Sequence, residues 1–405
     1  MRRREREIVV VRAIGYGKCG AAMFLLLLAG CSDLGDLATL PMRTEPAAVP
    51  STRAPSTDGR FAATADASAA VARAALVDQN LPGLSIAVAV GAEIVWAEGF
   101  GWSDLGRGET VTPDTRFRVG DLGVPLTAAA AGLLVERGVL DLDAPIQTYI
   151  AFPQKQWPVT ARQLMGATSG IRDLAFDEEW MRQAACRDDT GRLSIFADDP
   201  LRFEPGTASA YSAYGWIVLG AIIGAVSGEP YADFMAREVL RPLGMADTVP
   251  DQAAGQRAPG VATFYYPTFM MRTRQGLETA TRVDVSCVLP ADGYLSTPSD
   301  LARFAGALAG GALLRPETLS VLQSPVVLPD GTVTGETLGW EVGTIRGASG
   351  RPVRTIGREG DVFGGTASLL TLLAEGITVV VATNVSFGDT ATIAAEIARL
   401  FAATK

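Results

Sequence analysis

The side chains of this 405-residue chain that could do chemistry include no histidine. That absence excludes a Ser-His-Asp or Cys-His catalytic arrangement, a histidine proton shuttle and a zinc site held by imidazole. Acid–base work would have to come from carboxylates, lysine, tyrosine, cysteine or backbone groups.

Three serines, Ser169, Ser212 and Ser296, stand in short segments that also contain glycine or tyrosine. A serine nucleophile needs a neighbouring base, and none of the three has a lysine beside it in the sequence. We therefore interpret each of them as a turn or helix-cap residue.

Asp292, Glu359 and Asp361 form an acidic set that could hold a cation, because hard cations prefer oxygen ligands. The alternative, which we favour, is a solvated loop face without a metal, and no cofactor is expected. The formal charge of −9 argues against a nucleic-acid partner.

The first thirty residues have the layout of an export signal. A basic stretch precedes an apolar run, Ala21 to Leu28, which is too short to span a bilayer. Leu28-Ala29-Gly30-Cys31 then looks like a bacterial lipobox, so Cys31 is expected to be acylated and to become the mature N-terminus. An ordinary secretory signal with a chance cysteine is the alternative. Ser32 resembles an outer-membrane address, facing the periplasm if the host is Gram-negative.

Removal of residues 1–30 would take away six basic and two acidic side chains, a net +4, and leave −13. Such a surface is not expected to be drawn to anionic headgroups by charge, so the anchor must be the lipid. Residues 31–60 are rich in Pro, Ala, Thr and Ser and are expected to form a flexible linker that reaches roughly 30 Å. Cys186 and Cys287 would remain, either as a disulfide, which an oxidising compartment permits, or as two buried thiols.

Hydrophobic patterning places strands at both chain ends and helices between them. Helices are expected over 62–80, 127–137, 159–166, 213–227, 230–240 and 390–403, and strands over 83–90, 93–99, 338–346, 353–357, 366–373 and 377–383. This order predicts an α/β (α+β) fold in one domain, 61–405. An antiparallel sheet from 61–125 and 281–405 would be flanked by helices, with a mainly helical part, 126–280, inserted.

Residues 70–400 resemble the class C β-lactamase and penicillin-binding esterase family, in particular the branch of the mitochondrial β-lactamase-like protein and its bacterial relatives. The resembling stretches occur in the family's order: Phe117-Arg118-Val119-Gly120, Pro125-Leu126-Thr127-Ala128, Gly138-Val139-Leu140-Asp141-Leu142-Asp143, Thr168-Ser169-Gly170, Tyr211-Ser212-Ala213-Tyr214-Gly215, Pro242-Leu243-Gly244-Met245, Gly293-Tyr294-Leu295-Ser296-Thr297-Pro298-Ser299-Asp300-Leu301, and Gly360 followed by Gly364-Gly365. The resemblance implies an active site between the sheet and the helical part. A serine and lysine in S-x-x-K, a tyrosine in Y-x-N and a K-T-G or H-x-G strand would do the chemistry.

The matching positions in this chain have lost their reactive groups. Asp121 stands at the serine position and Val124 at the lysine position. Tyr211 is kept, but Ala213 replaces the asparagine, and the strand reads Arg358-Glu359-Gly360. An aspartate is a poor acyl acceptor because its acyl-enzyme would be an anhydride, and a valine cannot take a proton.

The resemblance therefore implies a protein that binds rather than hydrolyses. Its former cleft would contain Asp121, Tyr211, Arg358 and Glu359, and its partner would be a cell-wall peptide or an envelope protein. A weak esterase, peptidase or β-lactamase-like hydrolase with a displaced nucleophile is the alternative, and a purely structural partner is a third.

Three roles are open for Asp121. It could be a helix N-cap whose carboxylate accepts backbone N–H groups. It could form an ion pair with Arg358, because the two positions face each other in the family's cleft, and both roles could hold together. A replacement catalytic aspartate is the last alternative.

Overall fold

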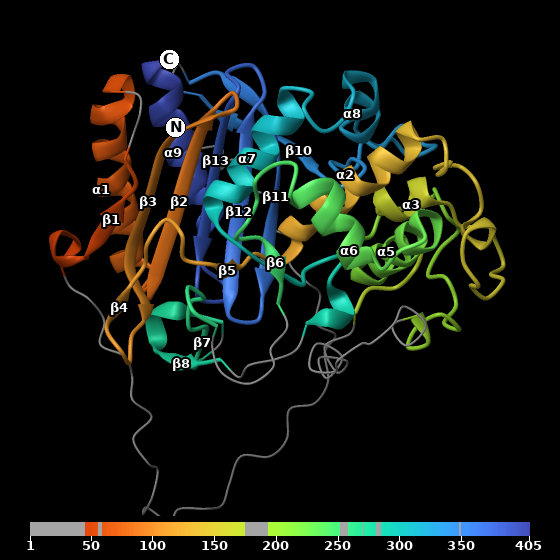
Figure 1. Ribbon diagram of the computed structural model, residues 1–405, viewed down its shortest axis with the longest axis horizontal. Helices are drawn as coiled ribbons and strands as arrows, with labels where there is room; N and C mark the ends of the chain where they lie inside the picture. Colours follow the sequence, from red (N-terminus) through yellow and green to blue (C-terminus); the bar gives the residue numbers. More distant parts are fainter. Residues whose placement is uncertain are drawn as a thin grey trace, which may run out of the picture. The chain divides into compact units, whose positions relative to one another are not determined.

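A computed structural model describes residues 45–55, 59–174, 193–251, 258–269, 271–280, 285–347 and 350–405. Its centre is an antiparallel sheet of eight strands in the order β1-β3-β2-β13-β12-β11-β10, with β4 paired to β3 (Figure 1). The strands are β1 (Ser51–Arg53), β2 (Gly83–Val90), β3 (Glu93–Asp104), β4 (Glu109–Thr110), β10 (Glu341–Arg346), β11 (Pro352–Val362), β12 (Gly365–Leu372) and β13 (Ile377–Thr383). β2 pairs directly with β13, so both chain ends build one sheet, which confirms the predicted architecture.

Alternating side chains of the central strands enter two separate cores. On β2, Leu84, Ile86 and Val88 pack with α1 (Ala62–Asp78) and α9 (Thr390–Thr404), whereas Ala87 and Ala89 face the larger core on the other side. The period of two residues explains this division, and both faces of the sheet are therefore buried.

The outer layer is closed by aromatic contacts between α1, β3 and α9. The Phe401 ring lies 5.5 Å from the Phe61 ring and 6.1 Å from the Trp96 ring. The hydroxyls of Thr64 and Thr404 are 2.6 Å apart, which ties the start of α1 to the end of the chain.

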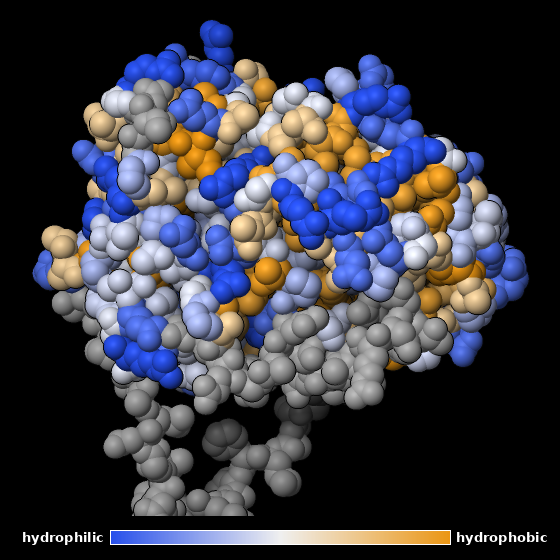
Figure 2. Space-filling model, in the orientation of Figure 1, coloured by the Kyte–Doolittle hydropathy of each residue, from blue (hydrophilic) through white to orange (hydrophobic). Residues whose placement is uncertain are grey.

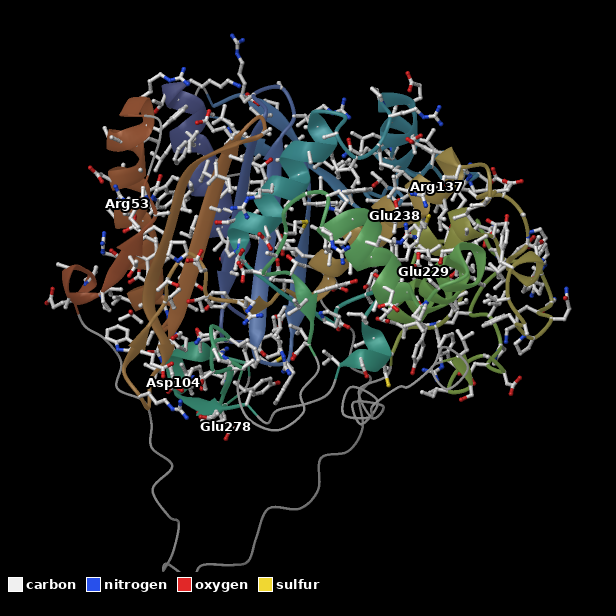
Figure 3. The ribbon with its side chains drawn as sticks, viewed as in Figure 1. Arg53, Asp104, Arg137, Glu229, Glu238 and Glu278 are labelled. Carbon is white, nitrogen blue, oxygen red and sulfur yellow. The ribbon has the colours of Figure 1, made fainter. Side chains whose placement is uncertain are left out.

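The inner layer is helical. α7 (Pro298–Ala309) packs against β2, β3 and β13. Beyond it lie α2 (Gly123–Glu136), α3 (Ala161–Met165), α5 (Ala213–Ser227), α6 (Tyr231–Met235) with the π-helical turn Ala236–Leu240, and α8 (Pro316–Leu322). Arg137 and Glu238, close together in Figure 3, form an ion pair between the end of α2 and this turn.

α2 and α5 are apolar on nearly all sides because they are buried in the inner core. Within the described ranges, no single helix is long and apolar enough to cross a membrane. α5 and the α6 segment that follows it reach the required length and composition only as a pair bent by 78°.

β1 corrects the predicted linker. Residues 51–53 lie inside the range 31–60, yet they extend the sheet by pairing with β3. Arg53, labelled in Figure 3, lies 2.5 Å from the carboxylate of Glu98, whose side chain is only 3% exposed. A buried carboxylate requires a nearby cation, and Arg53 supplies it from the segment that the composition assigned to a flexible chain.

Other boundaries also differ from the prediction, and β3 continues to Asp104, five residues beyond its expected end. β11 continues to Val362, five residues beyond the expected end, because it pairs with β12 along its whole second half. α2 begins at Gly123 rather than Thr127. The predicted helical part also contains short strands: β6 (Val249–Pro250), β7 (Tyr265–Pro267) and β8 (Leu277–Thr279).

Candidate functional site

The candidate site lies where β11 approaches the start of α2. Strand β5 (Phe117–Arg118) pairs with β9 (Tyr294–Ser296) and leads into the 3-10 turn η3 (Gly120–Leu122) that precedes α2. Gly120 has φ of 54°, which favours glycine. A Cβ on Gly360 of β11 would lie 2.3 Å from the carbonyl oxygen of Val119 and 2.6 Å from the amide nitrogen of Asp121. Glycine at position 360 therefore allows the strand to touch the turn.

Replacement of Gly360 with alanine should push β11 away from η3 and lower the free energy of unfolding by about 1–3 kcal/mol. Urea unfolding of the purified protein measures this loss. Gly215→Ala is the control, because a Cβ there meets its nearest neighbours at 3.7 Å, within the first turn of α5. Its change should be small and in the stabilising direction. Equal losses for the two variants would contradict the proposed close contact.

Asp121 is held by Tyr211. The Tyr211 hydroxyl donates a hydrogen bond to the Asp121 carboxylate across 90 residues of sequence. Burial, followed by the negative charge of Asp121, raises the pKa of Tyr211 well above its ordinary value, so the tyrosine stays a protonated donor at neutral pH. The N-cap residue of α2 is Leu122, without a side-chain cap bond, so Asp121 is not the predicted cap of that helix.

Arg358 contacts the ring of Tyr211, whose hydroxyl is bonded to Asp121. Its guanidinium carbon is 4.9 Å from the centre of the Tyr211 ring, a distance that suits a cation–π contact. The side chain is 4% exposed and pairs with Glu336 at 3.4 Å and with Glu341 at 3.8 Å. Its Nε is buried without a hydrogen-bond partner among the described residues.

The charges around Arg358 decide its protonation. Burial lowers the pKa of Arg358, but Tyr211, Asp121, Glu336 and Glu341 outweigh it and raise that pKa above the ordinary value. Arg358 and Asp121 are thus coupled electrostatically, with Tyr211 in contact with both. Their direct ion pair stays a prediction.

Glu336 and Glu341 are the two site residues that sequence reasoning missed. A buried arginine requires carboxylates, which is the available signal. The chain has 44 acidic residues, however, and nothing local in the sequence indicates which of them reach position 358.

The remaining predicted site residues, Val124, Ala213 and Glu359, have other surroundings from those of Tyr211 and Arg358. Val124 is fully buried in the inner core, and Ala213 is the first residue of α5. Glu359 follows Arg358 on β11, and the alternation of the strand turns its side chain to the other face. It lines a cavity of about 350 Å³ that also takes in Arg358, Glu341 and residues of α9. Burial and the charges of Glu341 and Asp389 raise the pKa of Glu359.

The three candidate serines have structural hydrogen bonds. Ser212 caps α5 by accepting from the amide of Gly215, which confirms the cap interpretation. The Ser169 hydroxyl accepts from the amide of Ile171 in a turn. The Ser296 hydroxyl is 2.7 Å from that of Thr248.

Lysine is the other group that a serine mechanism of this kind would need. The chain has three, Lys18, Lys155 and Lys405. Lys18 lies outside the described residues. Lys155 donates to the backbone carbonyls of Ala197 and Asp199, and Lys405, the last residue, donates to that of Glu375. Neither described lysine can therefore serve as the base beside Asp121.

Asp292, Glu359 and Asp361 do not share the predicted solvated loop face, because Asp292 is only 4% exposed while the other two are exposed. In the part of the chain that the structure describes, no group of three or more Cys, Asp or Glu side chains could hold a metal ion. Cys287 is buried and disulfide-bonded, and Cys186 lies outside the described residues.

Curated relatives are similar to this chain at modest identity. The serine beta-lactamase-like protein LACTB, mitochondrial, of Homo sapiens is 27% identical over 364 residues, covering 68% of this chain and 65% of the relative. Penicillin-binding protein 4* of Bacillus subtilis is 26% identical over 268 residues, covering 63% of this chain and 58% of the relative. The chain thus spans less than two-thirds of the length of these relatives.

Solved structures share the fold. The octameric penicillin-binding protein homologue from Pyrococcus abyssi superposes with a TM-score of 0.70 at 22% identity, covering 83% of this chain and 77% of that one. A D-stereospecific amidohydrolase from Streptomyces sp. has a TM-score of 0.67 at 21% identity, covering 82% and 97%. The beta-lactamase family model matches residues 63–403, which include every strand of the central sheet except β1, the inner helices and the candidate site. The chain belongs to the beta-lactamase family.

Proposed function

We propose that this protein is a non-catalytic, lipid-anchored member of the beta-lactamase family that binds a cell-envelope ligand or partner at its former active-site cleft. The observation that carries the proposal is the state of Asp121. Its carboxylate stands at the position of the family's serine and is engaged by a protonated Tyr211.

The surrounding groups support the loss of turnover. Val124 replaces the lysine and is fully buried in an apolar core, so it neither accepts nor donates a proton. In an unrelated serine hydrolase, removal of the nucleophile or its base lowers the rate by about 10⁶. Both groups are replaced here, and the described lysines lie elsewhere.

The charge of the cleft favours one kind of ligand. Four carboxyl groups, from Asp121, Asp292, Glu336 and Glu341, act on Tyr211 or Arg358, against the single guanidinium. A ligand that presents an amine is therefore favoured over one that presents only a carboxylate. A cell-wall peptide with a free amine would meet this condition.

Labelling tests the lack of catalysis. The protein is expected to give no covalent adduct with a fluorescent penicillin or a fluorophosphonate, and no nitrocefin hydrolysis above buffer. Asp121→Ser together with Val124→Lys should restore labelling, because Tyr211 is already in place, whereas Asp121→Ser alone should not. An adduct on any serine of the unsubstituted protein would instead support a hydrolase with a displaced nucleophile.

Retention of muropeptides on the immobilised protein tests binding. Peptides with a free amine should be retained better than their N-acetylated forms, and Glu341→Gln should weaken that retention, because Glu341 is the half-exposed carboxylate of the cleft. Equal elution of all peptides would point to a structural role with an envelope protein.

A further inference from the structure

Exposed apolar side chains gather at one end of the sheet. Phe269 and Met271, in the connection between β7 and β8, are 53% and 54% exposed, and Phe387, after β13, is 38% exposed. Tyr266 of β7 joins them, since its ring lies 5.6 Å from that of Phe387. Large apolar groups of this kind cost free energy in water unless something covers them.

The same connection carries positive charge. Arg272 and Arg274 are exposed, and no acidic residue lies between Pro267 and Leu277, in a chain of net charge −9. Glu278, labelled in Figure 3, follows on β8 opposite Tyr266 in the register. Figure 2 shows strongly hydrophilic side chains near β4, β7 and β8, at the lower left, where Figure 3 labels the acidic Asp104 and Glu278. Aromatic and aliphatic groups beside arginines are typical of surfaces that enter anionic lipid headgroups.

The connection is fixed to the body of the protein. The side-chain amide of Asn80 donates to the carbonyl of Thr273 at 2.8 Å, and the Thr273 hydroxyl donates to the carbonyl of Gln79. The amide of Thr268 donates to the carbonyl of Gly276. The first two bonds join the connection to the turn after α1, and the third closes the connection on itself.

The N-terminal segment enters the sheet at this end. The carbonyl of Pro50 accepts from the amide of Gly101, near the end of β3. A few residues later, the amide of Leu105 donates to the hydroxyl of Tyr265 on β7 at 2.8 Å. The described start of the chain therefore joins the sheet at the same end as β7.

We propose that Phe269, Met271, Arg272, Arg274 and Phe387 form a docking tip that inserts into an anionic phospholipid surface. The arginines bind headgroups and the apolar side chains enter the interface. This proposal rests on the lipid anchor of the proposed function, which holds the protein at the membrane. The tip then sets the orientation of the domain on that membrane.

An environment-sensitive fluorophore on Met271→Cys tests the tip in the full mature protein. With vesicles that contain phosphatidylglycerol, its emission should shift to the blue and be quenched by doxyl lipids, and vesicles of phosphatidylcholine alone should give a much smaller shift. The matched control is Val333→Cys, whose residue is 59% exposed on a loop outside the tip. The unsubstituted protein gives the labelling background.

Two further variants separate the tip from the anchor. The emission shift is measured against the concentration of anionic lipid. Arg272→Gln with Arg274→Gln should lower the membrane affinity of the tip read from that titration by about 25-fold, since each basic residue contributes about fivefold. Flotation with vesicles reports the anchor and should be unchanged in this variant when Cys31 is acylated. The proposal would be overturned if fluorophores at positions 271 and 333 showed the same emission and the same quenching on anionic vesicles, whether or not the protein floats with them.

Discussion

Replacement of Arg118 with methionine is expected to lower the free energy of unfolding by about 3–5 kcal/mol. Arg118 is 2% exposed, and its Nε lies 2.6 Å from the carboxylate of Asp251, which is 7% exposed. The guanidinium also stacks on Phe264 at 4.4 Å and donates to the carbonyl of Phe363. The variant would leave Asp251 as a buried charge without its cation.

Urea unfolding measures the decrease in the free energy of unfolding. Two further variants test whether the stranded Asp251 carboxylate causes it. Arg315→Met removes one partner of the pair with Glu136, but Arg315 is 65% exposed, so the change should stay below about 1 kcal/mol. Arg118→Met with Asp251→Leu should recover most of the loss, because the buried charge is gone. If the double variant were as unstable as the single one, packing rather than the stranded carboxylate would be responsible.

Replacement of Arg358 with methionine should have an effect of similar size, about 3–5 kcal/mol. The cation is buried, and it balances Asp121, Glu336 and Glu341. Methionine would keep much of the contact with the Tyr211 ring while removing the charge. The free energy of unfolding at neutral pH measures this loss.

A double-mutant cycle with Asp121→Asn tests the coupling across Tyr211. Arg358→Met should cost less when Asp121 is already neutral, with a coupling energy of about 0.5–3 kcal/mol. The matched cycle with Asp389→Asn should give a coupling near zero, because Asp389 caps α9 and acts on Glu359 on the opposite face of β11. Zero coupling to Asp121 would remove the electrostatic link between Asp121 and Arg358.

The sequence indicated the two buried arginines, Arg118 and Arg358, but not their acidic partners. Arg118 lies in one of the family-like stretches, so its importance could be inferred, but its partner Asp251 is 133 residues away and carries no motif. Arg358 was placed opposite Asp121 through the resemblance alone. Its carboxylates, Glu336 and Glu341, come from the loop before β10 and from the start of that strand.

The sequence by itself determined the fold class, and it carries Asp121 and Val124 where the resemblance expects a serine and a lysine. Period-two patterning in 83–90 and 377–383, and the identities of Asp121 and Val124, are local properties that survive without coordinates. Tertiary structure alone decided that Tyr211 holds Asp121, that β1 belongs to the sheet and that Glu359 faces α9. The physical reason is that a buried charge takes the partner nearest in space, and folding brings together segments whose sequences carry no mark of each other.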